Sequence, residues 1–159
     1  EFEQDYPYWL ATADEPVYLD QGYTLDGSWN VTAGRLETQV ITASPHSFTI
    51  TNGGGARVPR GYLLVEPRAA SSISNLRLVN SANLMEFTYS GSLSAGDSLE
   101  MEFLTKSIKK NGTNAYASFS TPATQLDWML LELGANLITI TGTVAGTVDL
   151  YWQWSRHYL

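Results

Sequence analysis

The chain contains no cysteine, and this absence excludes disulfide bonds and metal sites built from thiolates. Its 159 residues are nevertheless enough for one domain to bury a hydrophobic core without cross-links. We therefore expect packing and hydrogen bonding alone to hold the fold together.

Long apolar runs are also missing. No segment approaches the roughly 20 apolar residues that a membrane-spanning helix needs, so we expect no membrane insertion. The chain begins EFEQDYPYW, which lacks an initiating methionine and the basic and apolar regions of a signal peptide. We therefore expect the sequence to be a fragment of a longer protein or an engineered domain.

Basic residues are scarce. Nine Lys and Arg against 16 Asp and Glu give a formal net charge of −7, which is unfavourable for binding a phosphate backbone. We therefore expect no nucleic acid partner. Only 16% of the residues are charged while 12% are aromatic, a balance that is common in extracellular and virion β-proteins.

Recognisable catalytic and metal-binding motifs are absent as well. The sequence has no Gly-x-Ser-x-Gly elbow, and glycines 53–55 are not followed by the Lys-Ser/Thr helix start of a phosphate-binding loop. His46 and His157 lack the spacing of a metal site. Glu100 and Glu102 share a strand face, and paired carboxylates can hydrolyse glycosides, but a solvated strand face is the simpler interpretation. We predict no catalytic residue, metal or cofactor.

What the sequence does contain is alternation with a period of two. In residues 97–103 (DSLEMEF), Leu99, Met101 and Phe103 fall on one face and Glu100 and Glu102 on the other, as in a half-buried strand. In residues 148–154 (VDLYWQW), Trp152 and Trp154 share the apolar face. We expect this last strand to anchor the core, because each indole removes a large apolar area from water.

Turn signals separate about nine to eleven such short segments, and none has a long helical period. Asn111-Gly112 is the clearest turn, since both central residues of a type I′ hairpin need φ > 0, and we expect residues 116–119 to return from it as a strand. The sequence thus predicts an all-β fold, an antiparallel β-sandwich of the jelly-roll or galectin-like type. We expect one domain overall, with residues 1–45 as an N-terminal arm and the first strands, and residues 46–159 as the core of the β-sandwich.

Exposed aromatic residues are the remaining candidates for a binding site. If the two tryptophans of the last strand face inward, Tyr151 and Gln153 face outward. Tyr116 follows the Asn-Gly hairpin, and Trp29 follows a turn. Together these four side chains could form a ligand-binding platform on which a sugar ring stacks beside an amide. They could equally be ordinary sheet-surface residues or a subunit contact.

Several turn and core signals occur in an order that is typical of one family. They are Asn52-Gly53 with residues 56–59 (ARVP), the apolar strand 62–66, residues 94–99 (SAGDSL), residues 110–112 (KNG), Trp128 with Leu133, Gly134 and Asn136, and the ending 154–159 (WSRHYL). In this order, over about residues 46–159, the chain resembles the phage distal tail protein family and related siphophage minor tail proteins.

The resemblance implies a galectin-like β-sandwich in a phage tail tip or baseplate. In that family the sandwich lies outside a hexameric ring formed by a separate N-terminal domain, which residues 1–45 do not clearly show. The resemblance carries over no catalytic residue. The matched positions would serve backbone geometry and packing, namely Gly96, Gly112, Gly134, Trp128 and Trp154.

The resulting hypothesis is a non-enzymatic structural or adaptor domain of the virion, located in the phage tail and therefore extracellular, with other phage tail proteins as its partners. The main alternative is a carbohydrate-binding module that recognises host-surface glycans, and one domain could serve both roles. A third alternative, ranked below these two, is a jelly-roll enzyme that degrades polysaccharides.

Overall fold

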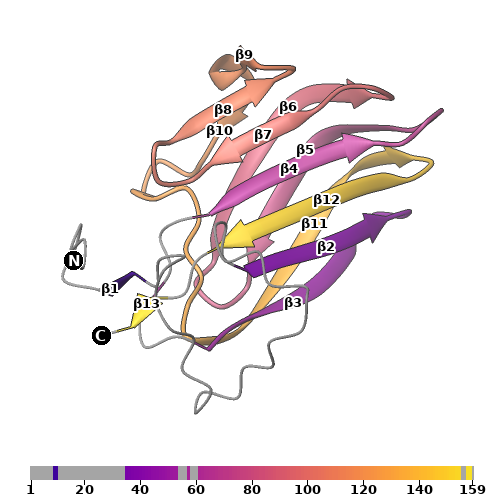
Figure 1. Cartoon of the computed structure of the whole chain (residues 1–159). Helices are drawn as coiled ribbons and strands as arrows, with labels where there is room; N and C mark the ends of the chain where they lie inside the picture. Colours follow the sequence, from indigo (N-terminus) through magenta and orange to yellow (C-terminus); the bar gives the residue numbers. More distant parts are fainter. Residues whose placement is uncertain (1–8, 11–34, 54–56, 58–60, 155–156, 159) are drawn as a thin grey trace.

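Two antiparallel sheets lie face to face and enclose the hydrophobic core (Figure 1). The computed structural model describes residues 9–10, 35–53, 57, 61–154 and 157–158. The chain is an all-β antiparallel sandwich of the jelly-roll or galectin-like type, as the sequence predicts. No helix among the described residues has the length and apolar character needed to cross a membrane.

The first sheet has five strands in the order β10-β6-β5-β11-β3. These strands are β3 (His46–Asn52), β5 (Ser72–Asn80), β6 (Met85–Ser94), β10 (Phe119–Ser120) and β11 (Gly134–Ala145). The second sheet has six strands in the order β2-β12-β4-β7-β8-β9. These are β2 (Arg35–Ile41), β4 (Tyr62–Pro67), β7 (Leu99–Glu102), β8 (Ser107–Lys110), β9 (Thr113–Asn114) and β12 (Val148–Trp154).

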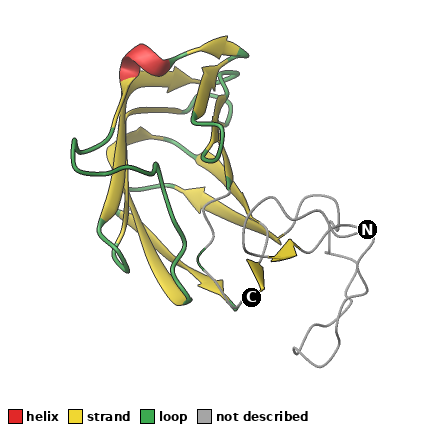
Figure 2. Cartoon of the chain, turned by 90° about the vertical axis from the view of Figure 1, so that its left-hand side faces the viewer, coloured by secondary structure: helices red, strands yellow, loops and turns green. Residues whose placement is uncertain are grey.

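Two short strands and one helical turn complete the described structure. Strand β1 (Trp9–Leu10) pairs with β13 (His157–Tyr158), which joins the two ends of the chain. The 3-10 helix η2 (Tyr116–Ser118) precedes β10. It lies at the end of the sandwich opposite to β1 and β13 (Figure 2).

Strand β12 lies inside the six-stranded sheet, between β2 and β4. Its inward side chains Val148, Leu150, Trp152 and Trp154 are buried, which confirms the predicted anchor. The Trp152 ring meets the Phe103 ring edge-on, with 5.4 Å between the ring centroids. The apolar area that each indole removes from water contributes about 2–3 kcal/mol to the stability of the fold.

The Asn-Gly hairpin forms as predicted, but the chain returns from it only as the two-residue strand β9, before residue 116. Asn111 and Gly112 have φ angles of 51° and 74° where they join β8 to β9. The strand expected over residues 116–119 is wrong, because Tyr116–Ser118 form η2 and only Phe119–Ser120 pair with β6 of the other sheet. The Asn114 side chain accepts a hydrogen bond from the Tyr116 N–H at 2.9 Å, and this Asx turn bends the chain out of the six-stranded sheet.

Residues 121–133 form an irregular segment that packs on the core. Trp128, Met129 and Leu131 in this segment are buried, and the Trp128 ring lies 4.2 Å from the Phe119 ring between centroids. Because the segment has no regular strand or helix, its backbone groups need other partners.

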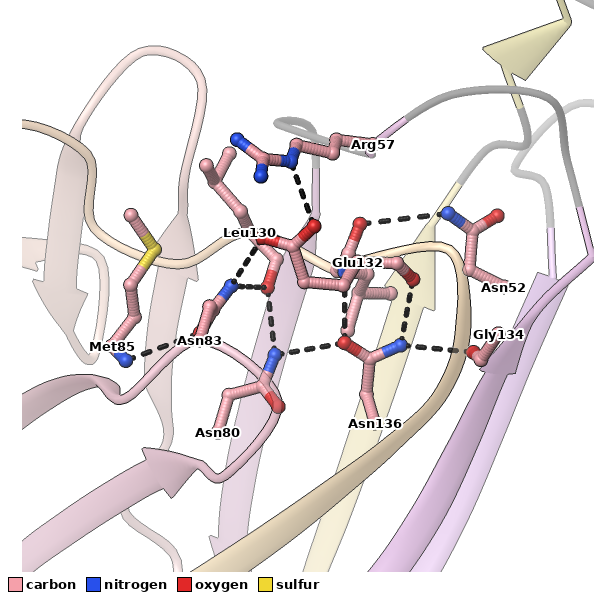
Figure 3. Close-up of polar contacts among 10 residues, drawn as sticks. Asn52, Arg57, Asn80, Asn83, Met85, Leu130, Glu132, Gly134 and Asn136 are labelled. Atoms are coloured by element: carbon pink, nitrogen blue, oxygen red, sulfur yellow. Dashed lines mark hydrogen bonds and ion pairs between the residues drawn. The ribbon is translucent and has the colours of Figure 1, made fainter.

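Four asparagine side chains, which we call the asparagine latch, supply many of these partners (Figure 3). The latch consists of Asn52, Asn80, Asn83 and Asn136. Asn80 and Asn83 donate to the carbonyl oxygen of Leu130 at 2.8 and 3.1 Å. Asn52 donates to the carbonyl oxygen of Leu131 at 3.5 Å. The latch therefore ties residues 130–131 to the ends of β3 and β5.

Asn136 is the central member of the latch and is fully buried. Its side-chain oxygen accepts from the Glu132 N–H at 2.8 Å and from the Asn80 amide at 2.9 Å. Its side-chain nitrogen donates to the carbonyl oxygens of Glu132 at 2.9 Å and Gly134 at 3.1 Å. One side chain thus closes the turn that leads into β11.

Candidate functional site

Two of the four predicted binding residues, Tyr151 and Gln153, lie on the outward surface of the six-stranded sheet. They alternate along β12 with the buried Trp152 and Trp154, and both are half-buried. The same alternation that buries the two indoles turns the tyrosine and the glutamine away from the core. Their outward orientation is as predicted.

The sheet register brings side chains of β4 and β7 beside them. Gln153 pairs with Tyr62, Tyr151 pairs with Leu64, and Leu64 pairs in turn with Glu100. Such direct cross-strand neighbours have Cβ atoms about 4.5–5.5 Å apart. We call this surface the tyrosine face, and its residues are Tyr62, Leu64, Glu66, Glu100, Tyr151 and Gln153.

The tyrosine face has an acidic character. Burial, the charge of Glu100, a hydrogen bond from the Tyr62 hydroxyl to Glu100 and the charge of Glu66 together raise the pKa of Tyr62 above its ordinary value of 10.0. The phenol is therefore protonated at neutral pH and keeps donating to Glu100. At the rim, Arg68 donates to both carboxylate oxygens of Asp149, at 2.7 and 2.8 Å.

The arrangement offers aromatic rings, an amide and carboxylates on three adjacent strands. Aromatic rings pack against the apolar side of a sugar ring, while amide and carboxylate oxygens accept hydrogen bonds from hydroxyl groups. Within the described part of the chain, no group of three or more His, Cys, Asp or Glu side chains is placed to hold a metal ion. The chemistry available on this face is stacking and hydrogen bonding.

The other two predicted binding residues do not join the tyrosine face. Tyr116 lies in η2 with 55% of its surface exposed, and its ring packs 5.9 Å from Trp128 and 6.1 Å from Phe119 between centroids. Strands β4, β7 and β8 lie between β12 and the β9 strand that leads into η2. Trp29 lies outside the described residues.

The two carboxylates considered for glycoside hydrolysis lie side by side on the outward surface of β7. The Thr105 hydroxyl donates to Glu102 at 2.7 Å, and the Tyr62 hydroxyl donates to Glu100. Glu102 is exposed and Glu100 is half-buried. Each of the two carboxylates already accepts a hydrogen bond from a neighbouring hydroxyl group.

Sequence reasoning missed the contribution of β4. The run YLLVE suggests a strand that is apolar on both faces, yet Leu63 and Val65 are buried while Tyr62, Leu64 and Glu66 face outward. Tyr62 and Glu66, the polar residues at the two ends of this run, fall on the same side of a strand with a period of two, so the sequence alone could have indicated a polar face. What the sequence could not supply is the register that sets Tyr62 beside Gln153.

Comparison with models of protein families gives a match over most of the sandwich. The family model described as siphovirus-type tail component, C-terminal domain, matches residues 60–156, which run from just before β4 to just after β12. Comparison with curated protein sequences finds no match.

The solved structures that match the chain include the following two. One is the Dit protein (gp 19.1) of phage SPP1, with 12% sequence identity and a TM-score of 0.48, described as a paradigm of the hub adsorption apparatus in phages that infect Gram-positive bacteria. That match covers 80% of this chain and 48% of the Dit chain, so the chain spans about half the length of this relative. The other is galectin LEC-6 of Caenorhabditis elegans, with 17% identity, a TM-score of 0.27, and coverage of 74% of this chain and 96% of the galectin.

The family match covers well over half of the 159 residues. It includes the whole of β4 to β12, and therefore most of both sheets. The chain belongs to the siphovirus-type tail component family, and the matched residues are its C-terminal domain.

Proposed function

We propose that this β-sandwich is a non-catalytic structural and adaptor domain of a phage tail tip or baseplate. It works in the extracellular virion and contacts other tail proteins. The observation that carries the proposal is the family match over residues 60–156. The Dit protein of phage SPP1 is described as a paradigm of the hub adsorption apparatus. We infer that this chain occupies a similar position in the tail of its own phage.

The residues that carry the family pattern support a structural role. Gly96, Gly112 and Gly134 have φ angles of 85°, 74° and 82°, where a glycine avoids the strain that a Cβ atom introduces. Trp128 and Trp154 are buried in the core. Each position therefore maintains the fold, and none presents a reactive group to a substrate.

Cross-linking mass spectrometry on intact virions of the encoding phage tests the adaptor role. Exposed lysines such as Lys109 and Lys106 supply the reactive amines on this domain. We expect cross-links from them to other tail proteins, and the same linkages should be absent from free domain mixed with disrupted tails. A chain that yields no cross-link to any tail protein in intact virions would overturn the proposal.

The tyrosine face supports a second candidate function, recognition of a host-surface glycan. The specific observation is the cross-strand pairing of Tyr62 with Gln153, next to Tyr151 and to the Tyr62–Glu100 hydrogen bond. Stacking surface, donors and acceptors thus lie side by side, and these are groups that a sugar can contact. Because the face is acidic, a neutral or amino-substituted glycan suits it better than an anionic one.

Glycan-array binding tests this second candidate. Wild-type protein is compared with Tyr151→Ala and Gln153→Ala on the tyrosine face, and with Tyr116→Ala as a matched loss of an exposed tyrosine elsewhere. We expect binding that Tyr151→Ala and Gln153→Ala each weaken about tenfold or more and that Tyr116→Ala leaves unchanged. If Tyr116→Ala alone lost binding, the glycan site would lie at η2 and not on the tyrosine face. If the wild-type protein bound no glycan on the array, glycan recognition would be refuted, while the adaptor role would be unaffected.

A further inference from the structure

The dipeptide Asn-Gly occurs twice in the chain, at residues 52–53 and at residues 111–112. Asparagine followed by glycine is prone to spontaneous deamidation, because glycine has no Cβ atom to shield its backbone nitrogen from the preceding side chain. The reaction needs an asparagine side chain that is free to turn toward that nitrogen. The structure places the two asparagines in different surroundings, and this difference indicates which of them reacts.

Asn52 is protected by the core. It is buried, it ends β3, and it pairs with Gly134 of β11. Its side chain belongs to the asparagine latch and donates to the carbonyl oxygen of Leu131. Attack by the Gly53 nitrogen would therefore require the latch and the end of β3 to open, and core strands open far less often than exposed turns do.

Asn111 lies outside the core, in the hairpin that joins β8 to β9, and both Asn111 and Gly112 are exposed. The Asn111 side chain contacts the turn that leads into β7. Its Nδ2 donates to Asp97 Oδ1 at 2.7 Å, and its Oδ1 accepts from the Ser98 N–H at 2.8 Å. We call these two hydrogen bonds the Asn111 clamp. Because the clamp joins two exposed turns, it can open without disturbing the core.

We propose that Asn111 is a site of spontaneous deamidation, at a rate that is set by the opening of the Asn111 clamp. Once the clamp is open, the Gly112 nitrogen gives up its proton and forms a bond to Asn111 Cγ. The bond between Cγ and Nδ2 breaks, and ammonia leaves with that proton. Water then opens the resulting succinimide at either of its carbonyl groups, which leaves aspartate or isoaspartate at position 111. The closed clamp delays the first of these steps.

The product of this reaction does not re-form the clamp. A carboxylate oxygen replaces the donating Nδ2, which lies 2.7 Å from Asp97 Oδ1, so two carboxylates would face each other there. Lys110, whose Nζ lies 3.0 Å from Asp97 Oδ2, would be shared between the two negative charges. Deamidation also adds one negative charge to a chain whose formal net charge is −7, so isoelectric focusing separates the modified chain from the unmodified one.

Peptide mapping by mass spectrometry, on the full chain incubated at mildly alkaline pH, measures both asparagines in one sample. In the folded protein we expect Asn111 to deamidate at least about tenfold faster than Asn52. In concentrated urea the clamp and the latch are both lost, so both asparagines should react faster and at comparable rates. The proposal would be overturned if Asn111 reacted no faster than Asn52 in the folded protein, or equally fast with and without urea.

Asp97→Ala tests the clamp directly. It removes the acceptor of the Nδ2 hydrogen bond, and we expect deamidation of Asn111 to become about threefold to tenfold faster. Asp97→Asn keeps an acceptor oxygen and should stay closer to the wild-type rate. Asp127→Ala is the matched control, since it removes an exposed carboxylate in the segment 121–133, and it should leave the rate unchanged. No acceleration at Asn111 in Asp97→Ala, or an equal acceleration at Asn52, would contradict the role of the clamp.

Discussion

Truncation of the central asparagine of the latch is expected to be among the most destabilising polar substitutions in this chain. Asn136 is fully buried and makes four hydrogen bonds of 3.1 Å or shorter. Each such bond contributes about 1 kcal/mol net, and buried partners left without one cost more. We expect Asn136→Ala to lower the free energy of unfolding by about 3–5 kcal/mol.

Urea denaturation followed by tryptophan fluorescence measures this change. With an m-value of about 2 kcal/mol per molar urea, the midpoint should fall by about 2 M. Asn114→Ala is the control, since Asn114 is exposed and its side chain makes the single bond to the Tyr116 N–H. That variant should lose about 1 kcal/mol.

A second substitution separates hydrogen bonding from packing. Asn136→Asp keeps the size of the side chain but places an oxygen against the carbonyl oxygens of Glu132 and Gly134. Burial and these oxygens should raise the folded-state pKa of the new carboxyl above its unfolded value of about 3.9. The variant should therefore lose stability as pH rises above about 4. Two results would refute the stabilising role of the asparagine latch. One is a loss of less than about 1 kcal/mol in the free energy of unfolding for Asn136→Ala, and the other is a stability of Asn136→Asp that does not depend on pH.

Two further predictions concern turns. Gly146 has a φ angle of 76°, and a Cβ atom added at this residue would lie 2.3 Å from Ser71 Oγ. Gly96 has a φ angle of 85°, and a Cβ atom added there would meet no heavy atom within 4 Å. Gly146→Ala should therefore cost about 1–3 kcal/mol more than Gly96→Ala in thermal unfolding, and equal costs would show that the contact with Ser71 is unimportant. Hydrogen bonds from Asn111 and the Ser94 N–H, together with Lys110, lower the pKa of Asp97 from 3.8 to about 2. The stability that Asp97 contributes is present above pH 3.8 and is lost as pH falls toward 2. Acid unfolding should therefore show that the wild type loses more stability between pH 3.8 and pH 2 than Asp97→Asn does. Equal losses in the two proteins would contradict the lowered pKa of Asp97.

The strands and their inward faces follow from local patterns in the sequence. The alternation in 148–154 correctly predicts the buried Trp152 and Trp154, and Asn111-Gly112 correctly predicts a hairpin. These signals are local, because a strand's period and a turn's φ angles depend on a few neighbouring residues.

Features that depend on distant residues could not be predicted. The tyrosine face needs the register of β4 against β12, which joins residues far apart in the sequence. The latch needs Asn80 and Asn136 to meet, although each alone looks like an ordinary turn residue. The turn at Tyr116 was missed because the Asx turn, in which the Tyr116 N–H donates to the Asn114 side chain, outweighs the strand preference of an aromatic residue.

Cryo-electron microscopy of intact virions of the encoding phage tests the central claim most directly. We predict density at the tail tip or baseplate that accepts the sandwich of β2 to β12, with contacts to neighbouring tail proteins. The same map shows whether the tyrosine face points outward toward the host surface. A tail tip without density for this sandwich, in virions that contain the chain by mass spectrometry, would contradict the adaptor function.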